Sequence, residues 1–206
     1  MSDESRDRAV QILTEHLFDK DKETSTVCTS AYTRYLADCG DYPEVDKLMA
    51  HRSKHVRTGV MKGLSKIIQS ADDAIERTRK QNAGIPVQSI DFPPLCERLA
   101  KGLKDDSRDV QRIAAAALQH AASKKGLDIA EAAPALVEIL SCGHAGTLQD
   151  AISALRASMW GLDSKTIETA KGALAALLDD KNKHVRQEAA DAVRMAGHIL
   201  EKRENA

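Results

Sequence analysis

Aromatic side chains are scarce in this chain. Phe, Trp and Tyr make up 3% of the 206 residues, and Trp160 is the single tryptophan. Proteins that hold nucleobases or other flat ligands commonly stack them on aromatic rings. The shortage therefore argues against a stacking platform, and we expect no cofactor.

Cysteines with the spacing of a metal or redox site are also missing. The four cysteines, Cys28, Cys39, Cys96 and Cys142, are scattered, and no two form a C-x-x-C pair. This usage is typical of a cytosolic protein with reduced thiols. We expect these cysteines to be buried structural residues and not catalytic ones.

The sequence shows neither a targeting segment nor a membrane span. Residues 1–8 are polar and charged and contain no apolar stretch of the signal-peptide type. No run approaches the roughly 20 apolar residues that a membrane helix needs. We therefore expect a cytoplasmic protein with no membrane partner.

Charge of one sign is not in excess either. The 30 Lys and Arg residues nearly balance the 31 Asp and Glu residues, which gives a net charge of −1. Proteins dedicated to bulk nucleic acid usually carry a strongly basic footprint. Nucleic acid is therefore not the expected partner, although local basic patches are compatible with this balance.

What the chain does contain is a repeated pair of amphipathic segments. The stretch from Leu174 to Gly197 has the pattern of a short helix, a polar turn and a second helix. In each copy an apolar residue of the first helix lies eleven positions before the first residue of the second-helix pattern. The last three copies are 37 and 38 residues apart, close to the period of about 35–47 residues of two-helix solenoid repeats. The second-helix patterns begin at Val56, Val110, Thr147 and Val185.

Three further columns of the second helices are apolar or small when that first residue is counted as position 0. Position 4 holds Val60, Ala114, Ala151 and Ala189, position 7 holds Gly63, Ala117, Ala154 and Ala192, and position 8 holds Leu64, Leu118, Leu155 and Val193. Spacings of 4, 7 and 8 lie on one helical face. The small residues at position 7 favour close approach of neighbouring helices. The pattern predicts an all-α fold, a superhelical stack or α-solenoid, with no sheet.

We expect one solenoid domain over residues 1–206. Its first helix pair, residues 5–40, is degenerate, as terminal repeats commonly are; Val27, Ala31 and Tyr35 are expected at its packed positions. Gly40 is expected to end this pair in a left-handed conformation. The other helix pairs are expected at about residues 43–81, 94–123, 129–159 and 164–200.

Residues 82–94 interrupt the periodicity. They include Gly84, Pro86, Pro93 and Pro94, a composition that excludes regular helix. Insertions in repeat arrays form loops on one face, which is often a binding face. We expect an insertion loop here, either a tolerated surface loop or part of a binding site.

The run Val185-Arg186-Gln187-Glu188-Ala189-Ala190 and the turn acids Asp105-Asp106 and Asp179-Asp180 resemble the HEAT repeat of the PBS-lyase-like type. The resemblance covers about residues 43–200. It implies an α-solenoid of about five HEAT-like helix pairs, with Asp and Arg side chains hydrogen-bonded in a ladder along the stack. The arginine slot of Arg57 and Arg186 holds Gln111 and Leu148 in the other copies, so the ladder is expected to be incomplete.

Enzymes with HEAT-like folds need residues that this chain does not have. Deoxyhypusine hydroxylase-like proteins hold two irons with His-Glu pairs, whereas the corresponding segments here are His55-Val56 and His184-Val185. HEAT-like alkylpurine DNA glycosylases need an aromatic cleft with an acid, and we expect Trp160 beyond the inner face of its helix. We therefore expect no catalytic residue.

His51 and His55 have the spacing of a two-histidine metal site. A turn separates them, and the neighbouring cations Arg52, Lys54 and Arg57 would repel a metal ion. We expect two solvated turn histidines and no metal.

The remaining candidate for a functional site is a polar row along the second helices. Positions 2, 6 and 9 point away from the packed face, because each helical residue turns by about 100°. Arg is enriched in protein interfaces, so we expect a non-enzymatic scaffold or adaptor that binds a partner protein along its concave face. The expected partner-binding residues are Lys62, Arg112, Gln119, Gln149, Arg156, Gln187 and Arg194. The alternatives are an ordinary solvated face, a nucleic-acid-associated HEAT-like protein, or a DNA-repair enzyme resembling the glycosylases.

Overall fold

The computed structural model describes residues 3–80, 92–123 and 127–205. Over this part of the chain all regular structure is helical: ten α-helices, one short 3-10 helix and no strand. None of these helices is both long and apolar enough to cross a membrane. The chain divides into two compact units, Met1–Ile90 and Asp91–Ala206, which are described separately.

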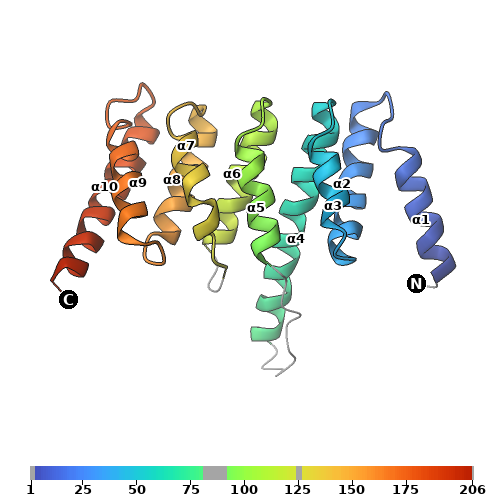
Figure 1. Ribbon diagram of the computed structural model, residues 1–206, viewed down its shortest axis with the longest axis horizontal. Helices are drawn as coiled ribbons and strands as arrows, with labels where there is room; N and C mark the ends of the chain where they lie inside the picture. Colours follow the sequence, from blue (N-terminus) through green and yellow to red (C-terminus); the bar gives the residue numbers. More distant parts are fainter. Residues whose placement is uncertain (1–2, 81–91, 124–126, 206) are drawn as a thin grey trace. The chain divides into compact units, whose positions relative to one another are not determined.

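The N-terminal unit contains two helix pairs (Figure 1). The first pair is α1 (Asp3–Glu15) with α2 (Lys22–Asp38), and the second is α3 (Tyr42–Met49) with α4 (Lys54–Lys80). α2 packs along α4, and α3 contacts both of them. Gly40, between the pairs, has φ 73°, which confirms the predicted left-handed residue after α2.

The packed face of α2 differs from the sequence expectation. Val27 was expected in the core, yet 60% of its surface is exposed, and Ala31 and Tyr35 are only half-buried. The buried face consists mainly of hydroxyl-bearing residues: Ser25, Thr26, Thr29, Ser30 and Thr33, with Leu36. The prediction was wrong because it followed the spacing of Val27, Ala31 and Tyr35, whereas the packed face of this helix is formed mainly by Ser and Thr.

Small hydroxyl side chains pack on this face of α2 because the facing residues of α4 include two glycines. A Cβ atom on Gly59 of α4 would lie 2.6 Å from the Cβ of Thr29, and one on Gly63 would lie 2.8 Å from the backbone oxygen of Ser30. The two helices therefore approach more closely than any larger residue on α4 would allow. The Thr29 hydroxyl donates to the Ser25 carbonyl of its own helix at 2.7 Å, so burial does not leave it without a partner.

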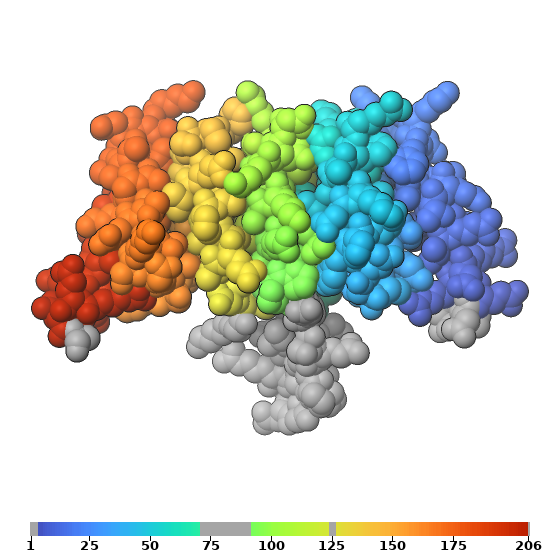
Figure 2. Space-filling model, viewed as in Figure 1, coloured from blue at the N-terminus to red at the C-terminus, as the bar shows by residue number. Residues whose placement is uncertain are grey.

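The C-terminal unit contains three helix pairs in sequence. They are α5 (Phe92–Leu103) with α6 (Arg108–Ala122), α7 (Ala133–Ile139) with α8 (Ala145–Ser158), and α9 (Ser164–Ala175) with α10 (Lys183–Glu204); the 3-10 helix η1 (Ala130–Ala132) precedes α7. The first helices contact one another in the order α5, α7, α9, and the second helices in the order α6, α8, α10. Figure 2 shows side chains of successive pairs of this unit, from green to red, packed against one another. The unit is thus a two-layered stack of helix pairs.

The predicted core columns of the second helices are buried, except that Val193 at position 8 of α10 is half-buried. In the C-terminal unit, position 0 is at most 2% exposed, position 4 is fully buried and position 7 is at most 1% exposed. The same positions on α4 of the N-terminal unit, Val56, Val60 and Gly63, are buried as well. The register read from the sequence is therefore confirmed for the second to fifth pairs.

The turn within a pair is closed by a recurring side-chain bond to the backbone. Arg186 donates to the carbonyl of Asp180 at 2.6 Å, and Arg57 donates to the carbonyl of His51 at 2.9 Å. Gln111 makes the equivalent bond to the carbonyl of Asp105 at 2.7 Å. Each donor reaches the carbonyl six residues earlier, so Gln replaces Arg in the same structural role.

The predicted insertion is shorter at its C-terminal end than expected. Residues 81–91 lie outside the described part of the chain, but Phe92, Pro93 and Pro94 form the first turn of α5 and not a loop. Proline is tolerated there because the first N–H groups of a helix have no partner within it. Phe92 is 7% exposed and anchors this turn in the core.

The cysteine expectation holds only in part. Cys96 on α5 is buried and Cys28 is half-buried, whereas Cys39 and Cys142 are exposed. Burial raises the pKa of the Cys96 thiol to about 12. The two exposed cysteines follow the ends of α2 and α7.

Candidate protein-binding surface

Six of the seven predicted partner-binding residues lie on three neighbouring helices of the C-terminal unit. Position 2 holds Arg112, Gln149 and Gln187, and position 9 holds Gln119, Arg156 and Arg194. Because α6 packs on α8 and α8 on α10, these positions recur from helix to helix; we call the six residues the second-helix row.

Every residue of the second-helix row is at least partly exposed to solvent. Arg112, Gln187 and Arg194 are exposed, and the other three residues are half-buried. The residues at positions 0, 4 and 7 of the same helices are buried, so each helix has one packed face and one face that solvent reaches. The seventh predicted residue, Lys62, is exposed on α4 in the N-terminal unit.

Three acidic residues lie among the residues of the row, and none of them belonged to the predicted binding set. Asp150 and Glu188 occupy position 3 of α8 and α10, and Asp191 occupies position 6 of α10; all three are half-buried. Asp191 forms an ion pair with Arg194. Position 6, which holds Asp191, was expected to point away from the packed face, whereas position 3 belonged neither to the expected core nor to the outward-facing positions.

The surroundings of Asp150 oppose its ionisation. Burial away from water raises the pKa of this carboxyl group, the nearby Arg112 guanidinium partly offsets the rise, and Glu188 adds to it. One carboxylate oxygen of Glu188 is buried without a hydrogen-bond partner among the described residues. The surface therefore holds carboxylates that the described part of the chain leaves poorly compensated, a feature common at binding surfaces.

Trp160 lies outside the row. It follows α8, is 54% exposed, and has the Lys202 ammonium 5.7 Å from the centre of its ring. Arg203 at the end of α10 donates to the carbonyls of Trp160 at 3.0 Å and Leu162 at 2.7 Å. These contacts fix the connection between α8 and α9 against the end of α10.

His51 belongs to the turn before α4. Its ring stacks on Phe18 with the centroids 4.8 Å apart, and its Nδ1 accepts a hydrogen bond from the backbone N–H of Ser53 at 3.1 Å. The described residues contain no cluster of three or more His, Cys, Asp or Glu side chains arranged for a metal ion.

Comparison with known proteins identifies the fold through structure and not through sequence. No family model matches the chain, and no curated protein matches it in sequence. Among solved structures, a computationally designed armadillo repeat protein for modular peptide recognition has a TM-score of 0.58 at 19% identity, covering 91% of this chain and 82% of its own.

Two further structures agree. A designed armadillo repeat protein in complex with the peptide (KR)4 has a TM-score of 0.57 at 19% identity, covering 95% of this chain and 86% of its own. An engineered protein has a TM-score of 0.55 at 21% identity, covering 94% and 87%. Likeness at this level of identity establishes the fold alone: the chain is a helical-repeat α-solenoid.

Proposed function

We propose that this protein is a non-enzymatic scaffold or adaptor that binds a partner protein along the second-helix row on the concave face of its solenoid. The observation that carries the proposal is the row itself. Polar residues recur at positions 2 and 9 of three adjacent helices and are exposed or half-buried, while positions 0, 4 and 7 of those helices are buried. Lys62 is proposed as a separate contact on α4.

The chemistry of the row suits a polypeptide better than a polyanion. Arg and Gln side chains can hydrogen-bond to backbone carbonyls and to acidic side chains of a partner. Asp150, Glu188 and Asp191 lie among them and would repel the phosphates of a nucleic acid. The complex of a designed armadillo repeat protein with the peptide (KR)4 supports peptide binding by a fold of this type, by analogy alone.

We also infer that the repeats are of the HEAT type and that the protein acts in the cytoplasm. HEAT repeats have two helices and armadillo repeats three. The C-terminal unit is built from pairs, α5 with α6, α7 with α8 and α9 with α10, and only η1 adds a short helical turn. The pairs, together with the Val-Arg and alanine pattern, favour the HEAT type.

Affinity capture from the native source with matched variants tests the proposal. Bait protein carrying Arg156→Glu and Arg194→Glu should lose the partner that the parent captures. Bait carrying Lys165→Glu and Lys181→Glu has the same change in charge at exposed residues outside the row and should keep it. Equal capture by both double variants would contradict the proposed surface.

The same experiment distinguishes a protein partner from a nucleic-acid partner. If the captured partner is lost on nuclease treatment, and if binding weakens steeply as salt is raised, the row recognises phosphates. A partner that resists nuclease and binds with only a weak salt dependence supports recognition of a protein.

A further inference from the structure

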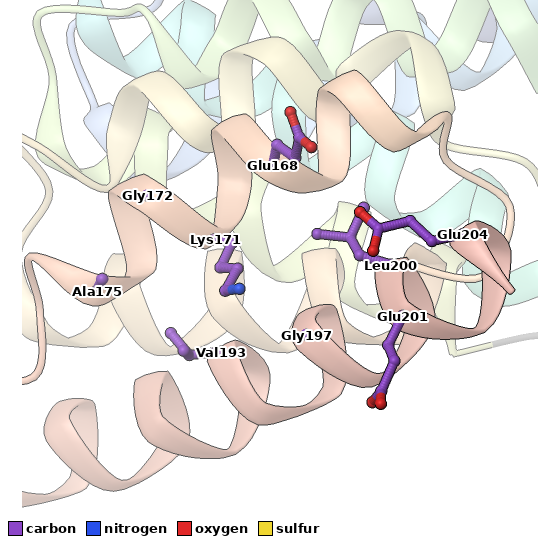
Figure 3. Close-up of a pocket in the computed structure, with 9 residues that line it drawn as sticks. All are labelled: Glu168, Lys171, Gly172, Ala175, Val193, Gly197, Leu200, Glu201 and Glu204. Atoms are coloured by element: carbon purple, nitrogen blue, oxygen red, sulfur yellow. The ribbon is translucent and has the colours of Figure 1, made fainter.

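An open groove of about 490 Å³ lies between α9 and α10. Figure 3 shows it lined by residues of these two helices alone, with Glu168 and Lys171 on α9 and Leu200 and Glu204 on α10. None of its lining residues belongs to the second-helix row, so the groove is a separate surface of the C-terminal unit.

The repeat register shows what kind of element this surface is built to contact. Val193 holds position 8 of α10, where Leu118 of α6 and Leu155 of α8 are fully buried. Lys171 lies fourteen positions before position 0 of its pair, where Cys96 and Ala133 are at most 1% exposed. In the preceding pairs these positions are covered by the surrounding helices; on the last pair both are only half-buried. The groove therefore exposes two positions that are buried by surrounding helices in the preceding pairs.

The groove is hollow because two residues on facing helices lack side chains. A Cβ atom on Gly172 of α9 would meet nothing within 4 Å, and one on Gly197 of α10 would meet only the Lys171 ammonium at 3.8 Å. Ala175, Val193 and Leu200 supply the apolar part of the lining. A ridge of apolar side chains can enter such a groove in the way that helices pack ridges into grooves.

The rim of the groove is acidic. Glu168, Glu201 and Glu204 are exposed, and within the described part of the chain their carboxylates have no ion-pair partner. Lys171 is the single cation among the lining residues. An occupant with positive charge beside its apolar ridge is therefore favoured over one with negative charge.

We propose that the groove between α9 and α10 binds an amphipathic helix of a partner protein, with its apolar ridge between Gly172 and Gly197 and with Lys or Arg residues facing the three glutamates. This is the helix-in-groove mode of recognition. The proposal does not depend on the second-helix row, because the two surfaces share no residue.

Two synthetic helical peptides of about 16 residues, or about four turns, serve as probes. Both carry Leu with the i, i+3, i+4, i+7 spacing; Lys flanks the ridge in one peptide and Glu in the other. Fluorescence anisotropy with the full chain should show that the basic peptide binds and the acidic one does not, and that salt weakens binding. No binding of the basic peptide, or equal binding of both, would overturn the proposal.

A filled-groove variant shows where the peptide binds. Gly172→Leu places a side chain in the open groove and, with no neighbour within 4 Å of its Cβ, should leave the fold intact. The substitution should lower the affinity for the basic peptide at least about tenfold, because the apolar ridge of the peptide can no longer enter the groove. Gly146→Leu on α8 is the matched control, since its Cβ also meets nothing within 4 Å, and it should bind as the parent does.

Two results with these variants would count against the proposal. Equal peptide affinity for Gly172→Leu and the parent would place binding on another acidic surface. Sedimentation that shows the parent self-associating, and Gly172→Leu abolishing this, would assign the groove to a second copy of the chain.

Discussion

Small residues at position 7 set how closely neighbouring second helices approach in the C-terminal unit. Ala154 on α8 and Ala192 on α10 are fully buried. Ala154→Leu or Ala192→Leu should lower the free energy of unfolding by about 1–3 kcal/mol, because the added carbons have no space in the packed interface.

Ala157 provides the control for this change, since it lies on the same helix as Ala154 and is exposed. Ala157→Leu should change stability by no more than about 0.5 kcal/mol. Urea denaturation of the three variants gives the comparison. Parent-like stability of both core variants would show that position 7 is not a tight contact.

Asp150 gives a prediction about pH. Its pKa is raised above the ordinary value of 3.8, chiefly by burial, so the folded state holds the proton more tightly than the unfolded state does. The ionised form therefore destabilises the fold, and this cost grows as pH rises through the raised pKa and is constant above it.

Asp150→Asn should accordingly increase the free energy of unfolding at pH 7, and the gain should shrink as the pH falls toward 4. Urea titrations of the parent and the variant at several pH values measure it. A variant less stable than the parent at pH 7 would show that ionised Asp150 is stabilised by interactions stronger than its burial cost.

At the scale of helices, contact between α2 and α4 depends on glycines that the periodic pattern only partly explains. Gly63→Ala should destabilise the protein by about 1–3 kcal/mol although alanine favours helix. The reason is that the new Cβ would lie 2.8 Å from both the Ser30 oxygen and the Thr33 Cβ.

Gly172→Ala is the opposite case. Its Cβ enters open space on α9, so the substitution should stabilise by about 0.5–1 kcal/mol through helix propensity alone. Thermal melts of the two variants should therefore move in opposite directions. A shift of both in the same direction would contradict the close approach of α2 and α4.

The sequence predicted the second to fifth helix pairs well because large apolar residues mark their packed columns. It failed for α2, where the packed face is formed by Ser and Thr against glycine, a pattern that hydrophobic periodicity does not detect. It also missed the groove between α9 and α10. Gly172 and Gly197 are ordinary helical residues in sequence, and their significance depends on which helix faces them.

The candidate surface was predictable only in part for a related reason. Positions 2 and 9 follow from helical geometry, and the structure shows their residues exposed or half-buried. The burial of Asp150 and the unpaired oxygen of Glu188 arise from packing between α6, α8 and α10, which no single helix reveals.

At the scale of the whole molecule, the proposal of one solenoid domain over residues 1–206 predicts cooperative unfolding. The two compact units carry different chromophores: Tyr32, Tyr35 and Tyr42 lie in the N-terminal unit and Trp160 in the C-terminal one. Urea transitions followed by tyrosine and by tryptophan fluorescence should coincide. Two separate midpoints would show that the units unfold independently.

Site-specific photo-crosslinking tests the proposed binding surface most directly. A photoreactive amino acid is placed at Gln149 or Gln187 in the second-helix row, and at Thr169 or Glu97, which are exposed on the first helices α9 and α5. In the native source, the row positions should each give the same discrete, nuclease-resistant protein adduct, and the first-helix positions should not. Adducts to that partner from Thr169 and Glu97 but not from the row would contradict the proposal that the second helices bind it.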